Sequence, residues 1–532
     1  MRNYLKNITK EAISKLEIDY NDDIVIDVPT KKGFGDYTTN IALKLASTLN
    51  TNSRELANSI VNEIQDEKID HVEVAGPGFI NFYLKNDYLF ENLNKIITEP
   101  NYGKSNIGNG QKINIEYVSA NPTGTLHLGH ARGAAYGDSL ARIMKYASYE
   151  VTREYYINDG GNQINNLITS IDARYQELKG IEIEFPEDGY HGVEIIEIAK
   201  ELLKKYPDNV SKEIIHEYGM NYLLNNIKAD LKKFNVEFDI WSSEKKLYEN
   251  KAVEKALNTL KDNGYTYEAE DALWLKTTEF GDEKDRVLVK NDGNYTYLLP
   301  DIAYHMDKLS RGYDKLIDVF GADHHGYIPR LKASIQMMGG DSNKLDVQIL
   351  QMVRLLQGGE EIKMSKRTGK VVTLNELVDE VGVDASRYIF TSKSLDTQLD
   401  FDMDIATKHN NENPVYYIQY AYARICSILG DYSGEIKTRE YHNLNSSYVL
   451  DILSKMYEFE NTISVAASKF MPHLITNYVY DLATLFHTFY AHEHVLTDNL
   501  EKTAEYINLI KAVSIIIKKS LELIGVQVYE KM

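Results

Sequence analysis

The sequence is poor in cysteine and in long apolar runs. Only one cysteine, Cys426, stands in 532 residues, which excludes an intramolecular disulfide and any cysteine-rich zinc module. No apolar stretch approaches the roughly eighteen residues of a membrane-spanning helix. Met1 to Asp19 alternates charge with isolated apolar residues and lacks the apolar core of a signal peptide. We therefore expect a soluble, unexported protein of the reducing cytoplasm.

Positive charge is also scarce. The chain has 59 lysines and arginines against 79 aspartates and glutamates, a formal net charge of −20. A basic surface is the usual signature of nucleic-acid binding, so the overall charge argues against an RNA partner unless the cationic side chains gather on one face. The length is too great for one hydrophobic core, and about two to four domains are expected.

One stretch of the sequence predicts a strand, a loop and a helix in succession. Ile113 to Val118 is rich in β-branched and aromatic residues, Asn121 to Gly124 has turn-forming residues, and small residues follow His130. This order places His127 and His130 at a helix N-terminus, where unpaired N–H groups and the helix dipole favour phosphate. A pair of surface histidines is one alternative. A metal site is another, but no third ligand follows at a matching spacing.

Two glycine-containing segments are further candidates for phosphate binding. The sequence GKS at 103–105 lacks the glycine that a P-loop needs five residues earlier, where Thr98 stands, so we interpret it as a linker. The sequence KMSK at 363–366 is flanked by glycines and is typical of a mobile cationic loop. Such a loop can bring ammonium groups onto the β- and γ-phosphates of a nucleotide as pyrophosphate leaves. Taken alone, KMSK is equally typical of a solvated charged loop.

The motifs and the blocks around them resemble class I aminoacyl-tRNA synthetases. HLGH at 127–130 resembles the ATP-binding signature of that class and of related nucleotidyltransferases. The longer stretch SANPTGTLHLGHARGAAYGD is similar to bacterial arginyl-tRNA synthetases. The resemblance covers nearly the whole chain and is weakest from 170 to 265. Gly160 departs from the family pattern, in which alanine is more usual at that position.

We expect an α/β protein of three domains. Residues 1–95 form a small N-terminal α/β domain, with a helix predicted over Tyr37 to Leu49 and two strand pieces over Val72 to Leu84. Residues 96–404 alternate strand, loop and helix, as a doubly wound Rossmann-type catalytic domain requires, and segments 271–277, 287–309 and 316–339 continue its parallel sheet. A charged helical insertion occupies about 170–265. Residues 405–532 form a C-terminal all-α helical bundle.

The resemblance also implies an activity. ATP and arginine would form arginyl-adenylate with loss of pyrophosphate, and the terminal ribose 2′-hydroxyl of tRNA(Arg) would then attack the adenylate. It further implies ATP with Mg²⁺, activation that depends on bound tRNA, a monomer, a tRNA-elbow contact by the N-terminal domain and anticodon binding by the C-terminal bundle. A small-molecule nucleotidyltransferase would not need that bundle, although a different class I synthetase stays open. The intact motif histidines and lysines argue against an inactive RNA-binding paralogue.

The same resemblance assigns residues to roles. The implied catalytic residues are His127, His130, Lys363 and Lys366. The implied ATP-binding residues are Thr123, Gly124, Leu128, Gly129, Gly321, Asp323, His324, Met364 and Ser365. The implied arginine-binding residues are Glu116, Ser119, Asn121, Tyr297, Asp301 and His324. The implied tRNA contacts are Phe79, Asn81, Tyr416, Tyr420 and Arg424, and no metal-binding side chains are expected.

Several of these residues have competing interpretations. An arginine pocket needs a carboxylate and neutral acceptors, because a guanidinium is always charged and offers five donors in a plane. Asp301 can supply that carboxylate. It also stands where a predicted strand ends and a helix begins, so a role as helix N-cap is the alternative. Gly321 to Gly326 looks like a metal cluster, yet adjacent residues rarely converge on one ion, so we interpret it as part of the adenosine site. Core packing is the alternative for the aromatic tRNA candidates.

Overall fold

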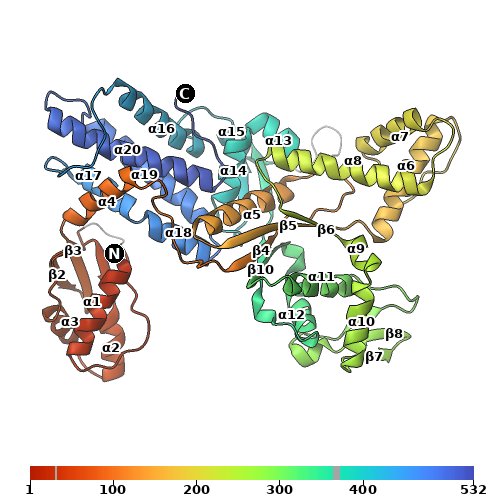
Figure 1. The fold of residues 1–532 in the computed structure, drawn as a ribbon, viewed down its shortest axis with the longest axis horizontal. Helices are drawn as coiled ribbons and strands as arrows, with labels where there is room; N and C mark the ends of the chain where they lie inside the picture. The colour runs from red at the N-terminus through yellow and green to blue at the C-terminus, as the bar shows by residue number, and fades with distance from the viewer. Residues whose placement is uncertain (30–32, 363–371) are drawn as a thin grey trace. The chain divides into compact units, whose positions relative to one another are not determined.

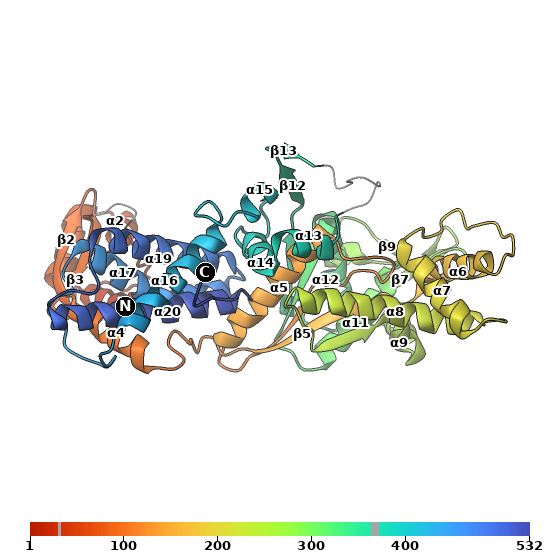
Figure 2. The same ribbon diagram turned by 90° about the horizontal axis from the view of Figure 1, so that it is seen from above.

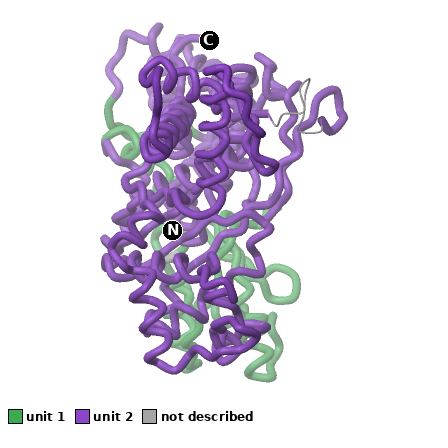
Figure 3. The backbone as a smooth tube through the Cα atoms, turned by 90° about the vertical axis from the view of Figure 1, so that its right-hand side faces the viewer, with its two compact units in different colours: residues 1–98, 437–444 green, residues 99–436, 445–532 purple. Residues whose placement is uncertain are grey.

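The computed structural model describes residues 1–29, 33–362 and 372–532. It consists of two compact units, one formed by residues 1–98 with 437–444 and the other by residues 99–436 with 445–532 (Figure 3). The short segment 437–444 is held to the N-terminal unit by hydrogen bonds with the Asn94 side chain. The Asn94 side chain donates to the Arg439 carbonyl (2.9 Å), and its amide oxygen accepts from Tyr441 Oη (2.8 Å).

The N-terminal unit packs four helices with a three-stranded antiparallel sheet of order β1-β3-β2. Its elements are α1 (Arg2–Lys15), β1 (Tyr37–Thr39), α2 (Ile41–Leu49), α3 (Ser53–Asn62), β2 (Ile69–Ala75), β3 (Phe79–Leu84) and α4 (Asp87–Thr98). The two predicted strand pieces are confirmed as the hairpin β2–β3. The helix prediction is wrong at Tyr37–Thr39, because these residues pair with β3 and bury Tyr37, and the helix begins only at Ile41.

The second unit is built on a five-stranded parallel sheet of order β11-β10-β4-β5-β6. The strands are β4 (Lys112–Glu116), β5 (Glu150–Ile157), β6 (Ile240–Ser243), β10 (Lys315–Gly321) and β11 (Leu345–Leu350). Strand β4 has β5 on one side and β10 on the other, so the strand order reverses there, and open α/β sheets bind ligands at the carboxyl ends of such strands. The doubly wound fold class is confirmed.

Two parts of the middle region differ from expectation. Residues 170–265 begin within α6 (Gly161–Leu178) and contain the helices α7 (Val193–Lys205), α8 (Lys212–Lys233), α9 (Glu244–Glu249) and α10 (Ala252–Asp262). They also contain β6, which pairs with β5, so the purely helical prediction is wrong at this strand. The predictions for segments 271–277 and 287–309 are wrong, because neither contributes a strand to the parallel sheet. Instead β7 (Thr266–Ala269), β8 (Ala272–Leu275) and β9 (Arg286–Val289) form a separate antiparallel sheet.

The remaining elements of this unit lead to a helical bundle. The connecting elements are α5 (Leu128–Tyr146), α11 (Leu298–Ser310), η2 (Ala322–Tyr327), α12 (Ile328–Met337), β12 (Val353–Gln357), β13 (Glu360–Glu361), α13 (Leu374–Val381), α14 (Val383–Thr391), β14 (Leu399–Asp402) and α15 (Met403–Ala406). The bundle helices are α16 (Pro414–Asp431), α17 (Ser447–Tyr457), α18 (Phe459–Ser468), α19 (His473–His492) and α20 (Leu500–Leu523). The parallel sheet and α5 lie between this bundle and the helices α6 and α7 (Figures 1 and 2). No helix in the described part of the chain is both long and apolar enough to span a bilayer.

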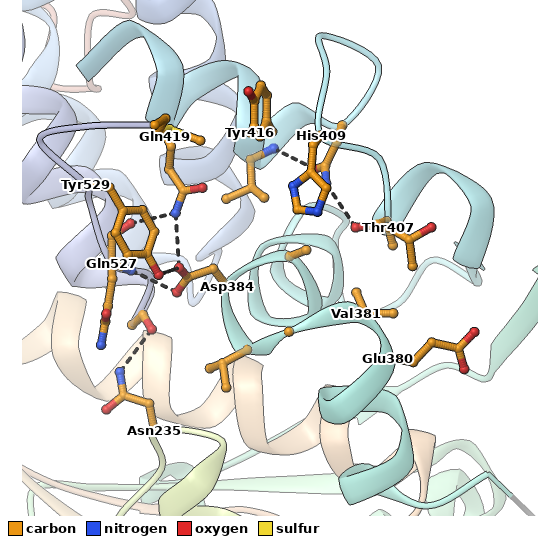
Figure 4. Close-up of a pocket in the computed structure, with 18 of the residues that line it drawn as sticks. Asn235, Glu380, Val381, Asp384, Thr407, His409, Tyr416, Gln419, Gln527 and Tyr529 are labelled. Carbon is orange, nitrogen blue, oxygen red and sulfur yellow. Dashed lines mark hydrogen bonds between the residues drawn. The ribbon is translucent and has the colours of Figure 1, made fainter. Parts of the chain in front are cut away.

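The segment after α20 is anchored on α14. The Asp384 carboxylate accepts hydrogen bonds from Gln527 N (3.0 Å), Tyr529 Oη (2.9 Å) and Gln419 Nε2 (3.1 Å), and these residues line a cavity of about 610 Å³ (Figure 4). A single carboxylate therefore ties the last residues of the chain to both α14 and α16.

Candidate active site

The two histidines of the HLGH motif form the start of α5. His127 is the N-cap residue, and its Nδ1 accepts a hydrogen bond from Gly129 N (3.1 Å). His130 Nδ1 accepts from His127 N (3.3 Å), and the two rings stack with centroids 3.7 Å apart. Because each Nδ1 acts as an acceptor, a neutral ring carries its proton on Nε2. The helix start therefore offers two imidazole N–H donors in addition to its backbone N–H groups.

Both imidazoles are neutral at pH 7. Burial lowers the pKa of His127. Burial and then the neighbouring His127 lower the pKa of His130 to about 3. The two histidines can therefore bind an anion through hydrogen-bond donors and the partial positive charge of the helix N-terminus, but they carry no full positive charge.

The neighbouring ATP-binding candidates are arranged around this helix start. The Leu128 side chain is fully buried, so only its backbone can face a ligand. A Cβ at Gly129 would lie 3.1 Å from His127 Cε1, so the glycine leaves room for that ring. Thr123 lies in the preceding turn, where its N–H donates to Asn121 O (2.8 Å), and Gly124 follows.

All four residues of the KMSK motif, Lys363, Met364, Ser365 and Lys366, lie outside the described residues. The chain just beyond it can be located. Thr373 forms a β-bridge with His127, and Leu374 N donates to Leu126 O (2.7 Å). Two stretches far apart in sequence, one at the HLGH motif and the other directly after the KMSK segment, therefore meet.

The strand β4 ends in a strained turn that holds Glu116. Val118 and Ser119 have φ values of 69° and 39°, and left-handed backbone at a β-branched residue is an outlier that costs about 1–3 kcal/mol. The turn lets Ser119 Oγ donate to Glu116 Oε1 (3.0 Å) and accept from Tyr156 N (3.1 Å). Ser119, predicted to bind arginine, therefore fixes a neighbouring carboxylate.

Asp301 lies in the first turn of α11. That helix begins at Leu298 with Tyr297 as its N-cap, so the N-cap alternative for Asp301 is wrong. Tyr327 Oη donates to the Asp301 carboxylate. Burial raises the pKa of Asp301 to about 6, although Tyr327 and then His305 lower it. Within the described residues no lysine or arginine pairs with Asp301, while Tyr297 is 68% exposed beside it.

The structure adds a carboxylate that the sequence did not single out. Glu244 is the first residue of α9, directly after β6, and is only 6% exposed. Burial raises its pKa to about 7; the nearby Tyr156 hydroxyl lowers it, and the charges of Asp301 and Asp159 raise it. A carboxylate that directly follows a strand of the sheet is a recognisable signal, but the sequence predicts helix at β6 and so gives no sign of this strand end.

Other predicted residues border this region. Gly321 ends β10, and Asp323 and His324 follow in η2, with His324 Nε2 3.5 Å from Asp323 Oδ2. His324 is close enough to lower the pKa of Asp301. Asn121 Nδ2 donates to Gln163 Oε1 (2.8 Å) at the start of α6. In the described ranges, no group of three His, Cys, Asp or Glu side chains is placed to hold a metal ion.

The two tRNA candidates of the N-terminal unit differ in exposure. Phe79 is 39% exposed, but Asn81 is 2% exposed and its amide oxygen accepts from Thr38 Oγ1 (2.7 Å). The Asn81 side chain therefore faces the interior, and a direct tRNA contact by Asn81 does not fit this structure.

The candidates of the bundle line a cavity of about 920 Å³. Tyr416 and Tyr420 stack with centroids 6.2 Å apart and planes within 7°, and the Arg424 guanidinium lies 4.7 Å from the Tyr420 ring centre and 4.6 Å from that of Tyr490. Arg424 Nη2 also donates to Tyr420 Oη (2.6 Å). The stripe is half-buried, so core packing is not its role.

Family models match the chain in three consecutive parts. They are the arginyl-tRNA synthetase N-terminal domain over residues 3–84, the catalytic domain of class I (R) tRNA synthetases over 92–409 and the DALR anticodon-binding domain over 418–532. The arginine–tRNA ligase of Geobacillus kaustophilus is 51% identical, covering 96% of this chain and 94% of the relative. That of Bacillus subtilis is 48% identical, covering 100% and 99%.

Solved structures agree on the fold. Arginyl-tRNA synthetase from Thermus thermophilus has a TM-score of 0.80 at 20% identity and covers 100% of both chains. The enzyme from Plasmodium falciparum has a TM-score of 0.78 at 20% identity, covering 100% of this chain and 99% of its own. Because relatives of one activity match this chain over nearly its whole length at about half identity, it belongs to the arginine–tRNA ligase family of class I aminoacyl-tRNA synthetases.

Proposed function

We propose that arginine is activated at the carboxyl ends of β4 and β10, with its guanidinium between Asp301 and Glu244. The observation that carries this proposal is a pair of carboxylates with raised pKa values at the ligand-binding edge of the sheet, the half-buried Asp301 and the buried Glu244. A buried carboxylate without a cationic partner is costly. A bound guanidinium supplies the missing charge and planar donors to both groups.

Adenylate formation then uses the adjoining helix start. The arginine α-carboxylate attacks the α-phosphorus of ATP, the bond to the β-phosphate oxygen breaks, and pyrophosphate leaves. The Nε2–H groups of His127 and His130 donate to the phosphate oxygens as negative charge develops on them. Lys363 and Lys366 are assigned to the leaving pyrophosphate, and Mg²⁺ enters as part of the MgATP substrate.

Transfer to tRNA completes the reaction. The 2′-hydroxyl of the terminal adenosine attacks the carbonyl carbon of arginyl-adenylate, and AMP leaves. We assign residues 96–404 to this chemistry, residues 1–95 to the tRNA elbow through surface side chains such as Phe79, and residues 405–532 to the anticodon loop. The aromatic cavity around Tyr420 supports the last assignment, because aromatic and guanidinium planes stack on bases. We also propose that the protein is a monomer and that it acts in the cytoplasm.

The decisive experiment replaces Asp301 with asparagine. Asp301→Asn should raise the KM for arginine steeply and narrow the discrimination against citrulline, which has almost the shape of arginine but no charge. A pocket that pairs a buried carboxylate with the guanidinium can reject citrulline by about 10⁴-fold. Asp307→Asn, on the same helix but at the surface beside Arg311, is the matched control. A normal KM for arginine in Asp301→Asn would refute the pocket assignment.

A further inference from the structure

Four buried charged side chains form a continuous chain beneath the proposed arginine pocket. Lys308 Nζ contacts the carboxylates of Glu116 and Asp318, the latter at 2.8 Å. Asp318 Oδ2 lies 2.7 Å from His305 Nε2, and His305 Nδ1 lies 2.7 Å from the backbone carbonyl oxygen of Asp301. All four charged side chains are at most 6% exposed. The chain thus begins at Glu116, at the end of β4, and ends at the backbone of Asp301, whose side chain is one of the two carboxylates of the proposed pocket.

The backbone explains why these groups meet. Glu116 and Asp318 are paired partners on the parallel strands β4 and β10. His305 and Lys308 are three residues apart on α11, so they lie on the same helix face above these strands. Asp301 is four residues before His305 on that helix, which places its carbonyl against the imidazole.

The hydrogen-bond geometry determines the protonation of His305. Its two ring nitrogens face a carbonyl oxygen and a carboxylate oxygen, and both of these groups accept hydrogen bonds. Both nitrogens must therefore carry a proton, which makes His305 an imidazolium. In agreement, burial would lower its pKa, but Asp318 raises it above the ordinary value. Burial would raise the pKa of Asp318, yet Lys308 and His305 lower it to about 2.

Core stability is a poor explanation for this arrangement. Charges alternate along the chain, so neighbouring groups attract one another. Burying two cations and two anions nevertheless has a larger desolvation cost than burying apolar side chains of the same volume. Such groups are retained where they specify geometry or function. One end of this chain is the backbone of Asp301, and the other end, Glu116, is close enough to raise the pKa of the Asp301 carboxyl.

We propose that Lys308, Asp318 and His305 are positioning residues for arginine activation, which hold the Glu116 carboxylate and the Asp301 turn of α11 at a fixed separation. This inference rests on the proposed role of Asp301 in arginine binding and on the arginine-binding role that the family resemblance implies for Glu116. Lys308 and Ser119 each engage one oxygen of Glu116. The imidazolium of His305 adds a positive charge next to Asp301, which favours the ionised carboxylate that arginine needs.

The direct variant is Lys308→Met, which removes the cation between the two carboxylates. Displacement of Glu116 and of the Asp301 turn should lower kcat/KM for arginine by about a hundredfold, because errors of about 1 Å in a reacting geometry cost that much. The KM for ATP should stay unchanged. Since this variant leaves Glu116 and Asp318 buried without a cation and can fail to fold, a milder change is also needed.

Asp318→Asn is that milder change. The introduced amide can accept from Lys308 through its oxygen and donate to a neutral His305 through its nitrogen, so both contacts survive while the imidazolium is lost. The other groups that face Asp301 are Tyr327 and His324 of η2, Glu116 of β4 and, electrostatically, Glu244 of α9. None of them changes. Loss of the His305 positive charge should raise the pKa of Asp301. The acid limb of the pH profile of kcat/KM for arginine should therefore move to a higher pH by about one unit.

Arg311→Met is the matched control, because it breaks a partly buried ion pair at the C-cap of the same helix. Arg311 Nη2 lies 2.9 Å from Glu154 Oε1, and no hydrogen bond or ion pair of Arg311 reaches Glu116 or Asp301 in the described chain. The variant should lower the unfolding temperature and leave the pH profile for arginine unchanged. An Asp318→Asn enzyme with the wild-type profile would overturn the positioning role. A normal KM for arginine in Asp301→Asn would instead overturn the pocket itself.

Discussion

His127 and His130 each use one ring nitrogen to accept a backbone N–H at the start of α5, which orients both rings before any substrate binds. Donors that are already in place stabilise developing charge without a cost of reorganisation. His127 and His130 therefore contribute through the fixed orientation of their N–H groups as much as through charge. Asp301 and Glu244 are the contrasting case, since their pKa values are raised and no lysine or arginine of the described residues pairs with either carboxylate.

At this scale we expect His130→Ala to slow adenylate formation about a hundredfold with little change in the KM for arginine. Loss of one preorganised donor to phosphate costs about 3 kcal/mol in the transition state. Single-turnover formation of the adenylate in the presence of tRNA measures the step directly. His492→Ala, in the bundle, is the control. An unchanged rate in His130→Ala would remove this residue from the mechanism.

The pH dependence of arginine use should reflect the two carboxylates. The guanidinium stays protonated, so only the carboxylates titrate, and they must be ionised to bind it. Their pKa values are about 7 for Glu244 and about 6 for Asp301. As pH falls through this window, kcat/KM for arginine should decline by about tenfold per unit. A flat profile down to pH 5 would contradict the assignment.

At the scale of elements, α5 connects the phosphate-binding site to the sheet. A Cβ on Gly137 would lie 2.2 Å from the Tyr117 ring, which follows β4 directly. This close approach holds the helix, and with it His127 and His130, against the strand that ends in Glu116. The packing of this helix on the sheet therefore requires glycine at position 137.

Two glycines of α5 provide a matched pair of substitutions. Gly137→Ala should lower the free energy of unfolding by about 1–3 kcal/mol through overpacking and slow adenylate formation by displacing the helix. Gly133→Ala places its Cβ at an ordinary 3.6 Å from Leu350 and should gain about 1 kcal/mol from helix propensity. Urea unfolding monitored by circular dichroism compares them. Equal stabilities would contradict the packing argument.

At the scale of the molecule, one buried guanidinium connects four segments of the larger unit. Arg387 of α14 pairs with Asp138 of α5 (2.7 Å) and donates to the carbonyls of Ile524, after α20, and of Phe234 and Asn235, after α8. The bundle and the helix of the HLGH motif therefore share a rigid junction. Ending the chain near Asp404 would remove the Ile524 carbonyl, so point substitutions test tRNA binding more cleanly than truncation.

We expect Tyr420→Ala in the full-length chain to raise the KM for tRNA about tenfold or more, with arginine and ATP binding unchanged. The loss of one aromatic–base stack costs about 1–3 kcal/mol. Tyr448→Ala removes a bundle tyrosine that stacks on His492 and does not line the cavity, and it should charge tRNA normally. Normal tRNA kinetics in Tyr420→Ala would show that the cavity is not an RNA contact.

The sequence by itself determined the family, the activity, the α/β class and the position of His127 and His130 at a helix start. These conclusions depend on contiguous residues, whose spacing survives in the linear chain. Strands of three or four residues, such as β1 and β6, carry too little periodicity to be recognised. Only the tertiary structure decided which charges meet, because partners such as Glu116 and Lys308 stand 192 residues apart. Burial, which makes those contacts strong, depends on the packing of the whole sheet.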